Sequence, residues 1–409
     1  MNKIIFLLLS FILFCSNSFA QSGWVRQNSG TSLDLLDVQF INSNTGFIVG
    51  RNNGSPTAAI FLKTTNGGTN WFSSNFPSES FLTLGFIDVN TGVISSGYNY
   101  RRTTNGGSTW TPITNLLGVW MAKIIFRNST TGFAFGPNSI DYTNDAGLSW
   151  QHSFVNGKIF LNDAVFLNQN KAIAIGSDSY KSTNGGINWT YTIPGAQYGI
   201  SNYDSNNVMS CGWYFNAISK STDGGINWAT VYNGIESDTV LFSVKYFNAN
   251  NAIVVGCAGK ILYTANGGIN WAQQISGVGS SLMRLTFINS QTGWIVGKNG
   301  VILKTTTGGV VTGFTQTSSE LPDKFSLSQN YPNPFNPTTK INYEIPISNY
   351  VQLKIYDALG YEIETLVNEK QNAGSYSVDY NASSLPSGIY FYKLITEKFS
   401  KTKKMILVK

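Results

Sequence analysis

Short apolar runs alternate with polar, glycine-rich turns along most of the chain. The apolar run, seen in Gly46-Phe47-Ile48-Val49-Gly50, returns about every 40 residues and has the length of one buried strand. The polar turn is best preserved at residues 143–150, where it reads Thr-Asn-Asp-Ala-Gly-Leu-Ser-Trp. Asn or Asp followed by Gly tolerates the positive φ angles of a tight turn between antiparallel strands. The pattern therefore predicts a series of β-hairpins and almost no helix.

The Trp that ends each turn sets the period of the repeat. A spacing near 40 residues is typical of four-stranded propeller blades. A large ring placed just past a turn can wedge between adjacent sheets and bury most of its area. Six turns carry this residue, at Trp71, Trp110, Trp150, Trp189, Trp228 and Trp271. We therefore predict one blade for each copy.

The seventh copy of the turn, Thr305 to Gly309, lacks its Trp. The missing piece lies near the start of the chain, because residues 23–30 read like residues 270–277. The first mature strand can therefore complete the last blade and place Trp24 in the empty position. This closure predicts a ring of seven blades without an exposed edge strand.

The turn phrase resembles the Asp-box, also called the bacterial neuraminidase repeat. Residues 143–150 match it fully, whereas the other copies replace Asp by Asn, except at Asp223, or vary the penultimate residue. Over about residues 24–311 the chain looks most like the photosystem II assembly and stability factor propellers, and sortilin-type receptors and xyloglucanases are more distant relatives. In those families the box is structural. The resemblance implies a fold and says little about activity.

The first 20 residues have the pattern of a secretory signal peptide. Lys3 precedes an apolar run from Ile4 to Phe14, and small residues lie at the cleavage positions before Gln21. Cys15 leaves open a lipoprotein signal, although Phe14 stands where a small residue is wanted. We expect no transmembrane segment after cleavage, because no other stretch approaches the roughly 18 apolar residues that a spanning helix requires.

The repeat stops after Gly309, and a second domain follows. We expect the propeller to span 21–311, a linker 312–324 and a small Ig-like β-sandwich 325–409. The fold class is thus all-β, a seven-bladed propeller followed by a sandwich. The sandwich strands are predicted at 340–345, 351–356, 362–367, 375–380, 389–396 and 405–408.

The C-terminal domain closely resembles the type A sorting domain of the type IX secretion system. Four phrases carry the likeness, at 331–335, 355–360, 385–390 and 401–409. The resemblance implies that the type IX machinery reads residues 325–409 and that a sortase-like peptidase removes them. It also implies a protein of the cell surface or the medium. A fibronectin-like adhesion module is the alternative interpretation of these strands.

The composition fits export and excludes some partners. Charged residues make up only 12% of the chain, and the basic excess of the propeller is mild and dispersed. Nucleic acid is not an expected partner, because phosphate tracking needs clustered charge. Cys211 and Cys257 remain after cleavage, and their offset around the repeat glycines favours two buried free thiols over a disulfide.

One column of the repeat is a candidate binding surface. The residue before each turn phrase is basic in five blades and Tyr in two, and symmetry would arrange these side chains as a ring. The photosystem assembly factors have basic residues at the corresponding position in a partner-binding patch. We therefore expect a polyanionic ligand, an acidic glycan or an acidic protein surface, although long stems that cover a neighbouring strand would give the same pattern. The column consists of Lys63, Arg102, Tyr142, Lys181, Lys220, Tyr263 and Lys304.

The less favoured hypothesis is that the chain is an enzyme, namely a carbohydrate-active enzyme (glycoside hydrolase) of the Asp-box propeller type. A sialidase is disfavoured by the scarcity of Arg, and a glycosidase needs two carboxylates across a cleft. A single His excludes a His cluster for zinc, so we expect no cofactor and no metal. We also expect a monomer. The acids that could line a channel are Asp34, Asp37, Asp88 and Asp163.

Overall fold

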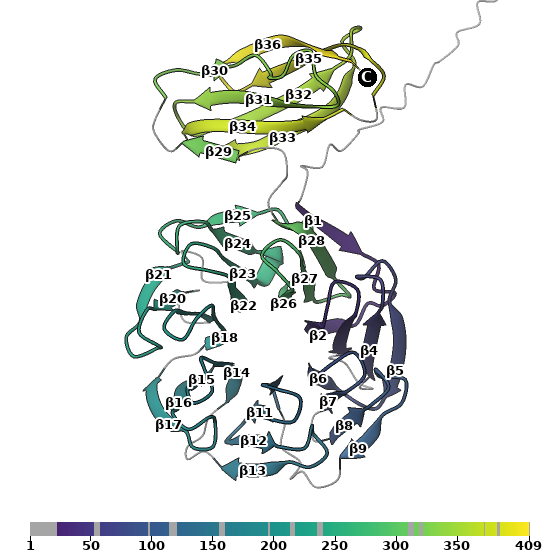
Figure 1. The fold of residues 1–409 in the computed structure, drawn as a ribbon, viewed down its shortest axis with the longest axis vertical. Coiled ribbons are helices and arrows are strands. Elements are labelled where there is room, and N and C mark those ends of the chain that lie inside the picture. Colours follow the sequence, from purple (N-terminus) through teal and green to yellow (C-terminus); the bar gives the residue numbers. More distant parts are fainter. Residues whose placement is uncertain are drawn as a thin grey trace, which may run out of the picture. The chain divides into compact units, whose positions relative to one another are not determined.

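The computed structural model divides into two compact units, Ser22–Val310 and Val311–Lys409 (Figure 1). The signal-peptide prediction for residues 1–20 lies outside the residues that the structure describes. Those residues are 23–52, 58–96, 99–113, 121–154, 160–194, 197–212, 217–234, 240–309, 315–318, 322–371, 373–382 and 385–408.

The first unit is a ring of seven four-stranded antiparallel sheets, and it confirms the predicted propeller (Figure 1). Six blades take four consecutive strands each, with the first strand at the centre and the fourth at the rim. Their strands are β2 (Asp34–Phe40), β3 (Gly46–Arg51), β4 (Ala58–Thr64) and β5 (Phe72–Pro77); β6 (Phe81–Phe86), β7 (Gly92–Ser96), β8 (Asn99–Thr103) and β9 (Thr111–Ile113); β10 (Lys123–Phe126), β11 (Gly132–Gly136), β12 (Ser139–Thr143) and β13 (Gln151–Phe154); β14 (Leu161–Phe166), β15 (Ala172–Gly176), β16 (Asp178–Ser182) and β17 (Thr190–Pro194); β18 (Gln197–Asn202), β19 (Val208–Gly212), β20 (Ile218–Ser221) and β21 (Ala229–Tyr232); and β22 (Leu241–Tyr246), β23 (Ala252–Gly256), β24 (Ile261–Thr264) and β25 (Ala272–Gln274).

The seventh blade joins the two ends of the ring. Its first three strands are β26 (Leu282–Phe287), β27 (Gly293–Gly297) and β28 (Ile302–Gly309), and its outer strand is β1 (Gly23–Gln27), which pairs antiparallel with β28. Trp24 is buried there, and its Nε1 donates to Gln274 Oε1 at 2.8 Å. A Cβ built on Gly309 would meet the Trp24 ring, as a Cβ on Gly225 would meet Trp228 of its own blade. Trp24 thus takes the position of the missing turn Trp.

Apolar side chains fill the spaces between adjacent blades. Phe40 of the first blade stacks on Trp294 of the last at a ring separation of 3.4 Å, and both side chains are buried. Four of the seven second strands, β3, β7, β11 and β27, start with a glycine that makes room for such a ring. A Cβ on Gly46 would lie 2.4 Å from the Phe40 ring, so the Thr-Gly-aromatic phrase requires a residue without a side chain at this point.

The Asp-box turns are held by their own side chains. Asp145 Oδ1 accepts hydrogen bonds from Thr143 Oγ1 at 2.7 Å and from the Ser149 amide at 2.9 Å. Thr143 Oγ1 in turn accepts from the Gly147 amide at 3.0 Å. The amide oxygen of Asn105 takes the acceptor role in its own copy. The turn needs an acceptor rather than a charge, which explains why Asn replaces Asp in most copies.

The second unit is a sandwich of two four-stranded sheets, ordered β29-β34-β31-β30 and β33-β32-β35-β36. Residues 312–324, predicted as a linker, include a strand of this sandwich, because β29 pairs with β34. Serine and threonine made this segment resemble a linker, and its partner strand lies some 60 residues away. The strands are β29 (Thr315–Ser318), β30 (Ser326–Leu327), β31 (Thr338–Ile345), β32 (Asn349–Tyr356), β33 (Glu362–Gln371), β34 (Gly374–Asn381), β35 (Gly388–Ile395) and β36 (Ser400–Leu407).

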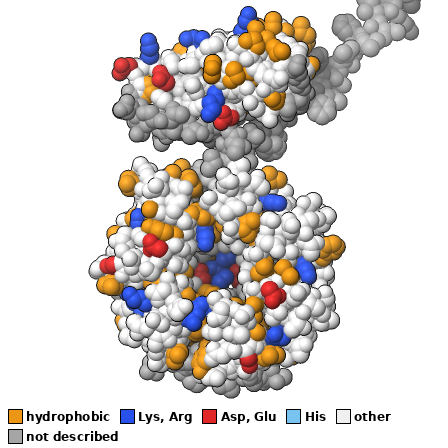
Figure 2. All heavy atoms as spheres, viewed as in Figure 1, with side chains coloured by type: hydrophobic (Ala, Val, Ile, Leu, Met, Phe, Trp, Pro, Cys, Tyr) orange, Lys and Arg blue, Asp and Glu red, His pale blue; other side chains and the backbone are white. Residues whose placement is uncertain are grey.

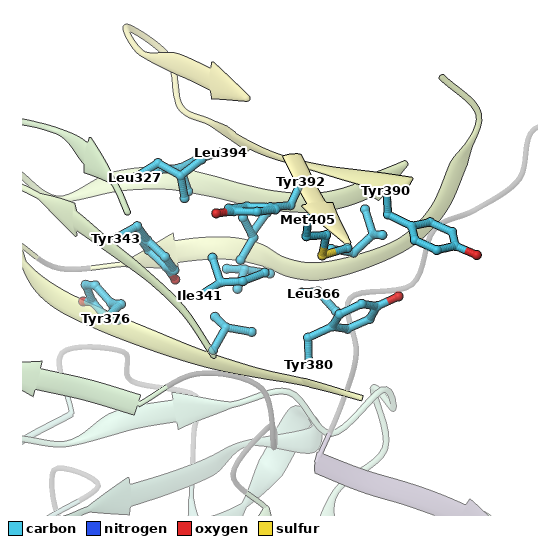
Figure 3. Packing of buried hydrophobic residues seen from close by; sticks show 14 of the residues in the cluster. Leu327, Ile341, Tyr343, Leu366, Tyr376, Tyr380, Tyr390, Tyr392, Leu394 and Met405 are labelled. Atoms are coloured by element: carbon cyan, nitrogen blue, oxygen red, sulfur yellow. The ribbon is translucent and has the colours of Figure 1, made fainter. Parts of the chain in front are cut away.

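The phrase at 331–335 holds the last strand of the sandwich. The Phe335 amide donates to Ile406 O at 2.9 Å, and Asn333 Oδ1 accepts from the Ile406 amide at 2.9 Å. The ring of Phe335 is buried in the core between the sheets, part of which Figure 3 shows around Tyr392. The start and the end of this unit are therefore in contact, which explains why the segments 331–335 and 401–409 occur together in the sequence.

Both cysteines of the described residues are free, as expected. Cys211 is buried, and burial raises its pKa, whereas Cys257 is partly exposed rather than buried. The described part of the chain contains no helix with the length and apolarity needed to cross a membrane.

Candidate functional site

The propeller presents two faces with different chemistry. In each blade the first and third strands run in the same direction, so the Asp-box turn, which follows the third strand, lies at the end of the first strand. We call this side the box face. The start of each first strand lies at the opposite face, which we call the entry face.

The basic column lies near the box face, and each of its cations reaches the turn of the next blade. Arg102 Nε donates to Ala146 O at 2.9 Å, and Lys220 Nζ donates to Gly267 O at 3.0 Å. These two acceptors are equivalent positions of their turns. The stems also pack on rings, since Lys220 Nζ lies 5.8 Å from the Tyr246 ring centroid. The column therefore links neighbouring blades.

The other cations of the column have similar surroundings. The amino groups of Lys63 and Lys304 lie against Gly106 and Gly67 of the neighbouring turns. Lys181 lies beside Gly225 of the next blade, and its burial lowers its pKa, although Asp223 acts in the opposite direction. All five cations remain partly exposed. None of them forms a salt bridge with another residue of the described chain.

The two tyrosines of the column differ from the cations in what they contact. The Tyr142 hydroxyl hydrogen-bonds to Gln151 within its own blade. Burial raises the pKa of Tyr263, which packs with the core between the last two blades. Both side chains are partly exposed. They occupy the two gaps in the ring of cations.

A second cluster of charges lies in the central channel, where Figure 2 shows basic and acidic side chains gathered in the hollow of the ring. Each first strand contributes one equivalent residue, which pairs with a residue near the end of the second strand, as Asp37 pairs with Val49 and Lys123 with Phe135. The blades differ at this position. In chain order the ring reads Asp37, Thr83, Lys123, Asp163, Gly199, Ser243 and Arg284.

The charged members of this ring pair across the channel. Lys123 Nζ lies 3.2 Å from Asp37 Oδ1, although one whole blade lies between theirs along the chain. Arg284 joins Asp163 at 3.0 Å through Nη1 and Asp37 at 3.5 Å through Nε. Thr83 Oγ1 donates to Asp37 Oδ2 at 2.7 Å. Two acids and two bases therefore form one neutral network that fixes four first strands to one another.

The network keeps its groups charged despite their burial. Burial alone would raise the pKa of Asp37, but Lys123 and Arg284, with hydrogen bonds from Thr83 and Leu84, hold that pKa below its usual value. Burial likewise opposes the charge of Arg284, yet Asp163 and Asp37 raise its pKa. A carboxylate held in this way cannot serve as a general acid near neutral pH.

The four acids considered from the sequence are separated by the fold. Asp37 and Asp163 line the channel, whereas Asp88 accepts the amides of Asn90 and Thr91 in a turn at the box face. Asp34 lies at the start of its strand and accepts from the Asn299 amide at 3.1 Å. The two channel acids are both ion-paired with bases, whereas the general acid of a glycosidase has to hold a proton.

One further acid stands close to the single histidine. Asp141 Oδ1 lies 2.5 Å from His152 Nδ1 between two strands of the third blade, and burial raises the pKa of Asp141 to about 6 while His152 opposes the shift. The pair is largely enclosed. The described residues contain no group of three or more His, Cys, Asp or Glu side chains that could hold a metal ion.

Sequence reasoning missed Lys123 and Arg284, although a signal for them exists. Asp37, Lys123, Asp163 and Arg284 each precede the closing glycine of their blade by the same 13 residues. Aligning the repeats on that glycine would have placed two acids and two bases at the same position of the repeat. The alternation of charge at this position would then have indicated pairing across the ring.

Comparisons with known proteins agree with both units. Residues 329–409 match the family model described as a secretion system C-terminal sorting domain. Residues 231–306 match the model of the photosynthesis system II assembly factor YCF48. The chain therefore carries the C-terminal address of type IX secretion, which leads to the cell surface or the extracellular space. No curated protein matches the chain significantly.

Solved structures share the propeller fold at low sequence identity. YCF48 bound to a D1 peptide is 20% identical, with a TM-score of 0.60 over 71% of this chain and 98% of that one. YCF48 from Cyanidioschyzon merolae is 18% identical, with a TM-score of 0.58 over 69% and 98%. PorZ, a surface component of the type IX secretion system of Porphyromonas gingivalis, is 12% identical, with a TM-score of 0.53 over 91% and 59%. These likenesses support the fold.

Proposed function

We propose that this chain is a non-catalytic binding protein of the cell surface or medium, and that its propeller holds a polyanionic ligand on the box face. The ligand is an acidic glycan or an acidic protein surface. In this account the signal peptide takes the chain across the inner membrane. The type IX machinery then takes it across the outer membrane, and a sortase-like peptidase removes the sorting domain.

The observation that carries the proposal is that the five partly exposed cations of the basic column form no salt bridge within the described chain. Each is also fixed in place by a neighbouring turn or ring, as Lys220 is by Gly267 O. Cations held in one orientation lose little freedom when a ligand binds. A ring of such charges would steer an anionic surface toward the box face.

The state of the channel acids supports binding over turnover. Asp37 and Asp163 are ion-paired, and Asp141 lies in a closed pair with His152 rather than opposite a second carboxylate. A carbohydrate-active enzyme is the alternative function, and it would need a carboxylate pair at another place. An acidic protein surface belongs among the candidate ligands because a YCF48 propeller has been solved with a bound peptide.

The test removes charge from two adjacent blades of the column. Lys181→Gln with Lys220→Gln should slow association with an acidic polysaccharide roughly 3- to 10-fold at low salt, because surface charges act mainly on association rates. Stability should fall by only about 1 kcal/mol, the contribution of the lost hydrogen bond to Gly267 O. Biolayer interferometry and thermal melts give the two quantities.

The matched control removes the same charge from the other face. Lys260 and Lys298 follow second strands and so belong to the entry face. Lys260→Gln with Lys298→Gln should leave association unchanged. If the column variant melts much lower and binds acidic polysaccharide like the native chain, the column has a packing role and the proposed ligand site is wrong.

A further inference from the structure

The mouth of the central channel at the entry face contains a cavity of about 190 Å³. Its wall takes one residue from each of the seven blades, all partly exposed, together with two arginines. Each of these seven directly precedes, in the sequence, the residue that its blade contributes to the ring in the channel. The cavity is lined by Leu36, Leu82, Ala122, Asn162, Tyr198, Phe242 and Met283, and by Arg51 and Arg284.

A backbone irregularity aims these side chains into the mouth. In six of the seven first strands the pairing with the second strand shifts by one residue, for example between Leu35 and Asp37. The extra residue of such a bulge leaves the ladder and its side chain is redirected. In these six blades the extra residue is the one that lines the cavity. The bulges repeated in the first strands therefore form most of the cavity wall.

The wall combines an apolar surface with cationic groups. Leu36, Leu82, Phe242 and Met283 present apolar side chains, and Tyr198 packs edge-on against Phe242 at a ring separation of 5.6 Å. Large apolar side chains that stay partly exposed at the bottom of a concave surface indicate a ligand site rather than a packed core.

The arginines have donors that the protein does not use. Arg51 Nη1 donates to Ser80 Oγ at 3.0 Å, but its buried Nε has no acceptor among the described residues. The buried Nε of Arg284 also lacks a hydrogen-bond acceptor there, and Asp37 lies 3.5 Å away as an ion partner. Guanidinium groups bind carboxylates through paired N–H donors. Arg284 is ion-paired with Asp163 and Asp37, whereas Arg51 at the rim has the carboxylate of Asp34 nearby but forms no salt bridge with it, so Arg51 is the group better able to take a new anion.

The volume limits the size of the ligand. An engineered apolar cavity of about 150 Å³ holds one benzene ring, whereas drug-sized ligands occupy about 300–1,000 Å³. The cavity therefore has room for one ring or one branched aliphatic group. We propose that the channel mouth is a second binding site, distinct from the box face, for a small monocarboxylate with an aromatic or branched aliphatic body. The body contacts the apolar wall, and the carboxylate pairs with Arg51.

Isothermal titration with 3-phenylpropionate tests this site on the full mature chain. Binding should be measurable at millimolar concentration or below, and the uncharged analogue 3-phenylpropan-1-ol should bind at least 10-fold more weakly. Equal binding of the acid and the alcohol, or no binding of the acid at 10 mM, would overturn the proposal. This comparison uses the native protein, so it does not depend on the folding of a variant.

Two variants then locate the site. Arg51→Gln should weaken 3-phenylpropionate at least 10-fold, and Ala122→Phe, which fills the cavity without changing charge, should abolish its binding. Arg26→Gln is the control, because Arg26 is an exposed arginine on the outer strand of the seventh blade. Unchanged binding in the folded Arg51 or Ala122 variant would place the ligand elsewhere and contradict the assignment. Association of polysaccharide with the box face should be the same in all three variants.

Discussion

Asp37 shows how one side chain can tie distant parts of the ring together. It accepts a hydrogen bond from Thr83 and lies within ion-pair distance of Lys123 and Arg284, so four blades depend on its carboxylate. The sequence suggested that an acid here could line a channel. Its partners could not be predicted, because an ion pair across a ring depends on which blades face each other rather than on sequence distance.

Replacing Asp37 by Asn should therefore destabilise the propeller strongly. Removing one partner of a buried ion pair typically costs about 3–5 kcal/mol, because the remaining charge loses its compensation. Lys123 keeps some exposure to water, so we expect the lower end of that range. Urea denaturation at pH 7 gives the difference, and Asp88→Asn, in an exposed turn, is the control. A change below about 1 kcal/mol in the Asp37 variant would contradict the account of the network.

The same network should make stability depend on pH in the acidic range. The folded pKa of Asp37 lies below its unfolded value of about 3.9, so its contribution is present above pH 4 and is lost as the pH falls through the folded pKa. The stability difference between the native chain and Asp37→Asn should therefore shrink between pH 4 and pH 2. Urea midpoints of both proteins at several pH values measure it. A difference that stays constant would mean that the carboxylate is not held ionised by its neighbours.

Hairpins and strands were predictable because each has a local cause. The turns are stabilised by side-chain acceptors such as Asp145 Oδ1. Several second strands begin at a glycine that packs against an aromatic ring, as Gly46 packs against Phe40. The bulges of the first strands were not predicted, although each one breaks the alternation of buried positions, as the burial pattern of β22 shows. The strand β29 was also missed, since its composition is that of a linker and only its distant partner makes it a strand.

The closing strand β1 is the element on which the ring depends. Trp24→Ala should cost about 3–5 kcal/mol, because a buried aromatic side chain is lost from the last blade. Deleting residues 21–30 should lower the melting temperature further and expose the edge of β28 to aggregation. Thermal melts and light scattering measure the two effects, and Val25→Ala, on an exposed position of β1, is the control. A chain starting at residue 31 that melts like the intact one would show that the ring closes in another way.

In this account the molecule consists of a signal peptide, a seven-bladed propeller and a C-terminal sorting domain. The sorting domain was predictable because four characteristic sequence segments occur in order. The structure gives one reason why the first and the last of them occur together, since the backbone of Phe335 is hydrogen-bonded to that of Ile406. The two faces of the propeller were not predictable to the same extent. The basic column could be aligned from the sequence, whereas the cavity at the entry face depends on the bulges.

Residues 312–409 should be sufficient to carry a foreign periplasmic protein across the outer membrane of a host with type IX secretion. A fusion to residues 325–409 lacks β29 and should be exported less efficiently, because one sheet of the sandwich loses its edge strand. Fractionation and immunoblotting of cells and medium give the result. Retention of the longer fusion in the periplasm would count against the sorting function.

The central claim is that the propeller binds a polyanion without turning it over. The most direct measurement incubates the mature propeller with a panel of acidic and neutral polysaccharides, and records retention and released reducing ends in the same samples. We expect retention on acidic members alone, weakening as salt rises from 50 to 500 mM because screening shortens the reach of surface charge, with no reducing ends formed. Release of reducing ends from any member, or retention that does not change with salt, would contradict the account.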